Sequence, residues 1–191
     1  MVALANQVRI IGGRHRGRRL RFVPGRGLRP TPDRVRETLF NWLQADIAGA
    51  RCLDLFAGSG ALGLEALSRG AAHVTLVEHN RQAAQRLRDN LDLLGEGAVA
   101  EVVQADARRL LAKAPPAPYD IVFLDPPFAD GLLPDVILQL EHNRWLADAA
   151  LVYVEQDASH AWPSLPETWG VHREGRAGQS AQRLLRRSNM R

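Results

Sequence analysis

The sequence contains one cysteine, one lysine and no long apolar run. Because Cys52 has no second cysteine to pair with, an internal disulfide and a cysteine-rich metal site are excluded. His73, His79 and His160 do not have the spacing of metal ligands. No uncharged stretch approaches the about 20 residues of a membrane helix, and Arg9 interrupts the start before a signal peptide could form. We therefore expect a cytoplasmic protein with no metal and no membrane partner.

Positive charge is concentrated at the two ends of the chain. Residues 1–36 hold ten arginines against the single acid Asp33, and residues 173–191 hold six arginines against Glu174. The formal net charge is +4, so the middle of the chain, with nine basic and nineteen acidic residues, carries −10. This asymmetry favours a polyanionic partner such as a nucleic acid, because guanidinium groups suit phosphate. A solvated run of charge is the alternative.

The N-terminal part predicts a short basic extension followed by a helix. Residues 1–30 contain two short apolar patches among glycine, proline and arginine, which is typical of a hairpin-like extension. From Thr31, a cap candidate, the sequence places Pro32 at the favoured first helical position and apolar residues at every fourth position from Val35 to Ile47. We expect an amphipathic helix that packs on the core.

Strand-like and helix-like segments alternate after residue 50. The expected strands are 51–56, 73–78, 100–104, 119–124 and 150–155, and the expected helices are 61–69, 81–94, 107–113 and 132–142. This succession predicts a doubly wound, Rossmann-like α/β fold with a mostly parallel sheet and helices on both faces. Two further strands, around Ala177 and Gly178, bring the expected number to seven. At 191 residues, the chain suits one such domain, over residues 31–191, behind the extension.

A glycine-rich loop follows the first expected strand. In DLFAGSGALGLEAL, Gly58, Gly60 and Gly63 satisfy G-x-G-x-x-G, the fingerprint of dinucleotide-binding loops. Asp54 lies four residues before Gly58, where a carboxylate would repel a pyrophosphate but hold an ammonium. S-adenosylmethionine carries an ammonium and no phosphate. The loop therefore favours S-adenosylmethionine as the cofactor, and a nicotinamide dehydrogenase, for which the chain has little room, is the alternative.

Acidic residues end the next two strands at positions that suit the rest of this donor. Glu78 would accept the ribose hydroxyls, and Asp106 lies where the adenine edge would be recognised. Each alone could be an ordinary acid at a strand end. The expected cofactor-binding residues are Asp54, Ala57, Gly58, Ser59, Gly60, Glu78, His79, Asp106 and Ala107.

The fourth expected strand ends abruptly in an acid and two prolines. The apolar run from Ile121 to Leu124 is followed by Asp125, Pro126, Pro127 and Phe128. Proline lacks an N–H for the ladder and fixes its own φ, so the strand stops there. Ligands bind at the carboxyl ends of strands in open α/β sheets, although a plain strand-to-helix turn would look similar.

The segment DLFAGSGALGLEAL together with DPPF resembles the Rossmann-like class I methyltransferases that act on exocyclic amino groups. More narrowly, the chain resembles the bacterial 16S rRNA guanine-N2 methyltransferase D family through IIGG, RGRRL, GLRPTPDRVRETLFNWL, GLLPDVILQLE, WLADAALVYVE and REGRAGQSAQRLL. The resemblance covers nearly the whole chain, and HRGRRLRFVPGRG and residues 95–118 depart from the pattern. It implies methyl transfer from S-adenosylmethionine to N2 of a guanine in 16S rRNA, within an assembling small subunit.

This resemblance assigns catalytic roles to residues 125–128, the proline-containing elbow at the end of the fourth expected strand. The guanine amino lone pair is delocalised, so two acceptors, the Asp125 carboxylate and the Pro126 carbonyl, would draw the group out of conjugation, while Pro127 helps hold them rigid. Phe128 would stack on the base. After transfer, Asp125 or water would take the proton.

The target base has to be unpaired or turned out of a helix before the elbow can reach it. We expect the basic N-terminal region to hold the RNA, through Arg14, Arg16, Arg18, Arg19, Arg34 and Arg36. We also expect a monomer. Two alternatives stay open: an adenine-N6 methyltransferase of DNA or RNA, which would use the same elbow, and a non-catalytic RNA-binding assembly factor, which would have no need of Asp125.

Overall fold

The computed structural model describes residues 6–25, 30–127 and 131–188. Fourteen helices and strands are found in these ranges. They are β1 (Gln7–Arg9), β2 (Arg19–Arg21), α1 (Asp33–Trp42), β3 (Arg51–Asp54), α2 (Ala61–Ser68), β4 (His73–Glu78), α3 (Arg81–Leu94), β5 (Ala100–Gln104), α4 (Ala107–Leu111), β6 (Tyr119–Leu124), α5 (Leu133–His142), β7 (Leu146–Asp157), β8 (Trp169–Ala177) and β9 (Ser180–Arg187).

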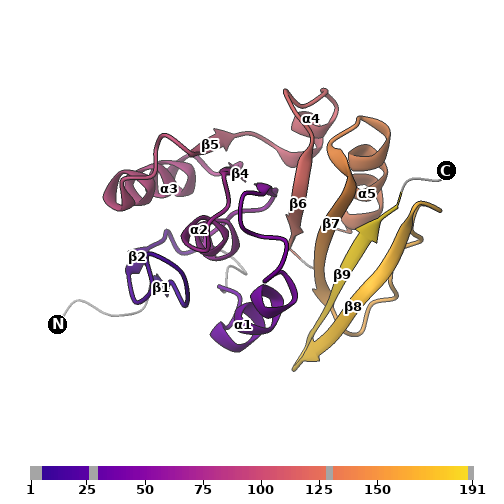
Figure 1. The fold of residues 1–191 in the computed structure, drawn as a ribbon, viewed down its shortest axis with the longest axis horizontal. Helices are drawn as coiled ribbons and strands as arrows, with labels where there is room; N and C mark the ends of the chain where they lie inside the picture. The colour runs from indigo at the N-terminus through magenta and orange to yellow at the C-terminus, as the bar shows by residue number, and fades with distance from the viewer. Residues whose placement is uncertain (1–5, 26–29, 128–130, 189–191) are drawn as a thin grey trace.

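Seven strands form one sheet in the order β5-β4-β3-β6-β7-β9-β8 (Figure 1). The pairs from β5 to β7 are parallel, and β9 pairs antiparallel with both β7 and β8. The predicted mostly parallel seven-stranded sheet is thus confirmed. Successive connections run outward in opposite directions from β3 and β6, so the carboxyl ends of these two strands border the crevice of the fold. The glycine-rich loop and the proline elbow both start there.

Two apolar layers cover the sheet. On one face α1, α2, α3 and the β1–β2 hairpin bury residues such as Leu20, Leu39 and Leu87 against it. On the other face α4 and α5 bury residues such as Leu111 and Ile137. Since every residue of α2 is buried, this helix lies inside the protein beneath the hairpin.

The β1–β2 hairpin is a separate two-stranded antiparallel sheet in which Val8 lies opposite Leu20. Both side chains are buried, together with Ile10, in the same apolar cluster as α2 and α3. The hairpin therefore packs on the core through its apolar residues, and its arginines between Arg9 and Arg21 are exposed.

Two local expectations differ from the structure. The helix expected to continue to Ile47 ends at Trp42, because Leu43 leaves helical geometry (φ −90°, ψ 1°); Ile47 is nevertheless buried. Thr31, expected as the cap, does not cap this helix: Pro32 occupies that position without a side-chain bond. The Thr31 hydroxyl instead donates to Oδ2 of Asp125, 3.3 Å away, and so links the start of α1 to the elbow.

Candidate active site

The glycine-rich loop turns sharply between β3 and α2. Gly58 and Gly60 have φ values of 52° and 80°, which favour glycine. A Cβ on Gly60 would also lie 2.7 Å from side-chain atoms of Leu64 and Leu87, and one on Gly63 would lie 2.3 Å from Leu76. The G-x-G-x-x-G pattern therefore serves the turn and the close packing of α2 on the sheet.

Asp54, the last residue of β3, is hydrogen-bonded to the helix that follows this loop. Its Oδ2 accepts a hydrogen bond from the Gly63 N–H, 2.9 Å away, and the side chain is buried. Burial raises the pKa of Asp54 to about 7, against the lowering effect of the backbone hydrogen bond from Gly63. Asp54 thus orders the loop, and its direct contact with an ammonium stays a prediction.

Glu78, at the end of β4, lies against the same loop. Its Oε2 accepts from the Gly58 N–H at 3.0 Å, and its Oε1 accepts from the Asn80 N–H at 2.7 Å. His79 is exposed, with Nδ1 3.3 Å from Glu78. The structure therefore brings together the loop and the acid that the sequence singles out. Within the loop, Ala57 and Ser59 are buried.

Asp106 follows β5, the strand next to β4. Its Oδ1 accepts from the Arg109 N–H at 3.1 Å and caps α4, whose first residue, Ala107, is buried. The Asp106 side chain is otherwise exposed. Because β3, β4 and β5 are adjacent and parallel, the loop, Glu78 and Asp106 lie in sequence along one edge of the sheet.

The elbow begins one strand further along. Phe123 of β6 lies opposite Asp54 of β3, and its carbonyl accepts from the Leu55 N–H at 3.2 Å, so β6 ends beside the loop. Asp125 is partly buried, Pro126 is buried and Pro127 is exposed. Burial, followed by the negative charge of Glu155, raises the pKa of Asp125 well above its ordinary value. Phe128 lies outside the described residues.

A buried acid on β7 faces the elbow, and the sequence analysis missed it. Glu155 accepts hydrogen bonds from the Tyr153 hydroxyl at 2.9 Å and the Ser180 hydroxyl at 2.5 Å. The Ser180 hydroxyl in turn accepts from the Gln182 amide, so β7 and β9 share this network. The sequence does carry a signal: Glu155 directly follows the apolar run ALVYV and ends the strand expected over 150–155.

The arginines predicted to bind RNA lie in separate places. The Arg14 guanidinium bonds to Glu96, just after α3, and the Arg18 guanidinium bonds to the Leu93 carbonyl in the last turn of α3. The backbone N–H of Arg14 donates to the Ser68 carbonyl at the end of α2. Eight residues of α2 separate that point from the glycine-rich loop, a rise of about 12 Å. The exposed Arg16 and Arg19 belong to the same hairpin. These four arginines therefore lie near the opposite end of α2 from the glycine-rich loop.

Arg34 and Arg36 differ from each other although both lie on α1. Arg34 is exposed in the first turn of the helix, three residues after Thr31, which bonds to Asp125. Arg36 is only 2% exposed; its guanidinium bonds to Asp33 at 2.5 Å and to the fully buried Glu65 at 3.4 Å. This position differs from the expected RNA contact. Arg36 links α1 to α2, and its burial leaves it unable to contact RNA at the surface.

Within residues 6–25, 30–127 and 131–188, no group of three or more histidine, cysteine, aspartate or glutamate side chains could hold a metal ion. In the same ranges no helix has both the length and the apolar character needed to cross a membrane.

The strand order, the glycine-rich loop with its strand-end acids and the Asp-Pro-Pro elbow together define a Rossmann-like class I methyltransferase. Residues 8–186 match the family described as "Conserved hypothetical protein 95". The chain is 55% identical to "Ribosomal RNA small subunit methyltransferase D" of Escherichia coli, over 96% of this chain and 91% of that protein. It is 44% identical to the Haemophilus influenzae protein of the same name, over 93% of each chain.

A solved structure of the Escherichia coli protein yhhF superimposes with a TM-score of 0.90, at 52% identity over 96% of this chain and 99% of that one. The chain belongs to the ribosomal RNA small subunit methyltransferase D family.

Proposed function

We propose that the protein transfers a methyl group from S-adenosylmethionine to the exocyclic N2 of a guanine in 16S rRNA. The single observation that carries this proposal is the junction of β3 and β6, where the loop held by Glu78 lies next to the Asp125 elbow. A donor pocket and an acceptor site for an amino group thus share one crevice. The names of the 55% and 44% identical relatives support ribosomal RNA as the substrate class.

The residues at the donor edge fit S-adenosylmethionine by the chemistry of their groups. Glu78 offers carboxylate oxygens beside the loop, and Asp106 offers one beside the next strand, which suits ribose hydroxyls and the adenine amino group, respectively. The buried loop residues Ala57 and Ser59 present no charge that would oppose a cationic donor. When bound, S-adenosylmethionine supplies an electrophilic methyl group on a sulfonium.

The elbow prepares the amino group for attack. Two acceptors, the Asp125 carboxylate and the Pro126 carbonyl, bind the hydrogens of the guanine amino group and weaken its conjugation with the ring. The prolines fix both acceptors in advance, so little reorganisation is needed at the moment of reaction. Thr31 donates to Asp125 Oδ2 and fixes its orientation. Phe128 stacks on the base, and Asp125 or water takes the proton after transfer.

The substrate guanine is turned out of its helix or unpaired, within 16S rRNA of an assembling small subunit in the cytoplasm. The protein works as a monomer in which the extension, residues 1–30, binds RNA and residues 31–191 carry the chemistry. Basic side chains at the outer side of the hairpin, among them Arg16 and Arg19, support the first assignment.

The experiment is methyl transfer from tritium-labelled S-adenosylmethionine to purified small-subunit particles, followed by digestion to nucleosides. We expect the label in N2-methylguanosine. Label in N6-methyladenosine would replace the guanine assignment with the adenine one, and no transfer together with tight particle binding would indicate a non-catalytic assembly factor. The Asp125→Ala protein serves as the negative control.

A further inference from the structure

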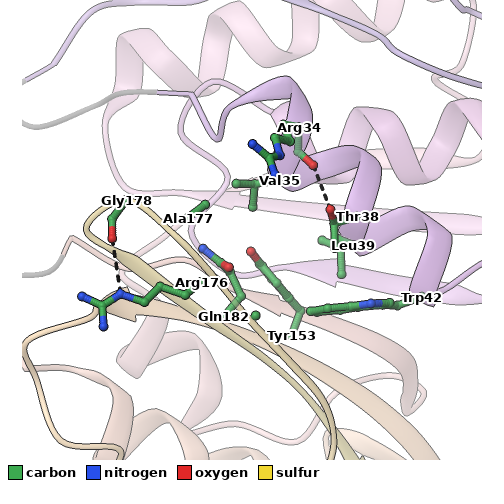
Figure 2. Close-up of a pocket in the computed structure, with 11 residues that line it drawn as sticks. Arg34, Val35, Thr38, Leu39, Trp42, Tyr153, Arg176, Ala177, Gly178 and Gln182 are labelled. Atoms are coloured by element: carbon green, nitrogen blue, oxygen red, sulfur yellow. Dashed lines mark hydrogen bonds between the residues drawn. The ribbon is translucent and has the colours of Figure 1, made fainter.

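A cavity of about 330 Å³ lies between α1 and the β8–β9 hairpin, apart from the donor loop (Figure 2). The α1 side contributes Arg34, Thr38 and Trp42, and the hairpin contributes Gly175 to Gly178 and Gln182. Tyr153 of β7 lies at its inner end. A site of this size falls at the lower end of the range of about 300–1,000 Å³ that small ligands occupy.

This cavity lies beside the end of β6, where the elbow begins. Tyr153, which lines it, pairs with Phe123 of β6, two residues before Asp125, and donates its hydroxyl hydrogen to Glu155. Thr31, three residues before Arg34, donates to Asp125. An RNA strand with its target base at Asp125 would thus have this cavity beside it.

The walls combine positive charge with a flat ring. Figure 2 shows Arg34 on the α1 side and Arg176 on the hairpin side of the cavity, and both are exposed. The described residues that line it include no acid. Gly175 approaches the ring of Trp42 so closely that an added Cβ would lie 3.3 Å from its Cη2 atom. Gly175 therefore packs against the edge of the indole, and a larger residue at this position would push on the ring.

We propose that this cavity binds one single-stranded RNA nucleotide next to the target guanine, with its base against Trp42 and its flanking phosphates at Arg34 and Arg176. The inference rests on the proposed function, whose substrate it extends by one recognised neighbour. Base stacking on an aromatic side chain tolerates any base, and guanidinium groups bind phosphate oxygens through charge-assisted hydrogen bonds. The site therefore selects an unstacked strand and excludes a base held in a duplex.

The test measures binding of the full-length protein to a short, fluorescently labelled single-stranded oligoribonucleotide across a salt series. We expect Arg34→Ala and Arg176→Ala each to lower the log-log salt slope by about 0.7. Lys113→Ala is the matched control, because it removes one exposed positive charge after α4, on the other face of the sheet. It should leave affinity and slope at wild-type values.

The base is tested with an abasic oligoribonucleotide that keeps the same phosphates. Trp42→Leu should weaken binding of the normal strand by about 5- to 150-fold and leave the abasic strand unchanged, whereas Trp42→Phe should retain most of the affinity. If Trp42→Leu does not fold, Thr38→Leu narrows the cavity from the exposed side of α1 and should show the same difference between the two strands.

Arginine variants that bind like Lys113→Ala would overturn the proposal. So would a Trp42 or Thr38 effect of equal size on both strands, since the base would then have no part in binding. Variants that bind the oligoribonucleotide normally but small-subunit particles weakly would indicate a protein contact instead. Methyl transfer by the wild-type protein is assayed separately, so failure of the proposed function would appear there and not in these comparisons.

Discussion

Tyr153 donates its hydroxyl hydrogen to Oε2 of Glu155 across 2.9 Å, and both side chains are buried next to the elbow. Glu155 also accepts from Ser180, so both of its oxygens are engaged within the protein. Burial and the charge of Glu155 together raise the pKa of Asp125 well above its ordinary value. In the proposed mechanism Asp125 accepts hydrogen bonds best when ionised, so Glu155 would influence the pH at which methyl transfer begins.

We expect Glu155→Gln to move the pH dependence of methyl transfer towards lower pH. The substitution removes a neighbouring negative charge, so less work is needed to ionise Asp125 and its pKa falls. Single-turnover rates between mildly acidic and mildly alkaline pH measure the shift. Glu167→Gln, which removes an exposed acid far along the chain from the elbow, is the matched control. A midpoint common to all three proteins would contradict electrostatic coupling between Glu155 and Asp125.

Asp125→Ala should lower the single-turnover rate by about 10²- to 10³-fold, the usual cost of removing one preorganised polar group at a reacting centre. Affinity for S-adenosylmethionine, measured by calorimetry, should change little, because the proposed donor contacts come from the loop and Glu78. Asp46→Ala removes an exposed acid after α1 and controls for net charge. A rate within a few-fold of wild type would remove the carboxylate from the mechanism.

Glu78→Ala should weaken donor binding by about 1.5 to 3 kcal/mol, the usual loss for hydrogen bonds to a charged group. The Gly58 N–H also loses its acceptor, so the loop loosens while the sheet stays intact. Glu78→Gln retains one acceptor oxygen, so its donor affinity should lie between those of the wild-type and Glu78→Ala proteins. Calorimetric titration with S-adenosylmethionine gives the affinities, and the thermal midpoint reports on the fold. Equal donor affinity in all three proteins would place the ribose elsewhere.

Asp54 makes stability depend on pH. Its pKa of about 7 in the folded protein exceeds the unfolded value of 3.8, so the unfolded chain loses this proton first as pH rises. The stabilising contribution is full below about pH 4 and declines by about 1.4 kcal/mol per pH unit until pH passes the folded value. Asp54→Asn should abolish this part of the slope when the free energy of unfolding is measured by urea denaturation between pH 4 and 7. Parallel plots of unfolding free energy against pH for the wild-type and Asp54→Asn proteins would show that Asp54 does not cause this pH dependence.

Local patterns in the sequence predict most of the strands and helices well. The bounds of β4, α3, β5 and β6 agree with the segments expected, because apolar runs and flanking glycine or proline act over short distances. The partners of buried charges depend on distant segments and could not be predicted in this way. Arg36 is buried because Glu65, 29 residues later, lies in the all-buried α2, and Glu155 is held by Ser180 across β7 and β9.

The structure separates the hairpin arginines that bond within the protein from those that are free to contact RNA. Arg14 and Arg18 also bond to Glu96 and to the Leu93 carbonyl, so changing them would disturb the packing of the hairpin. Arg16 and Arg19 are exposed and are the better choice. If each contacts one phosphate, the double change to alanine should reduce the log-log salt slope for rRNA binding by about 1.4, or 0.7 per contact on a single strand.

The control for this pair is Arg108→Ala with Lys113→Ala, which removes the same charge from around α4. Donor affinity should be unchanged in both double variants, because neither pair belongs to the loop, to Glu78 or to the elbow. Equal slopes in the two variants would mean that the hairpin is only a solvated charged surface. RNA would then be held near the elbow alone, where Arg34 and Arg176 line the same cavity, and transfer rates on small-subunit particles would depend on those two arginines and not on the hairpin.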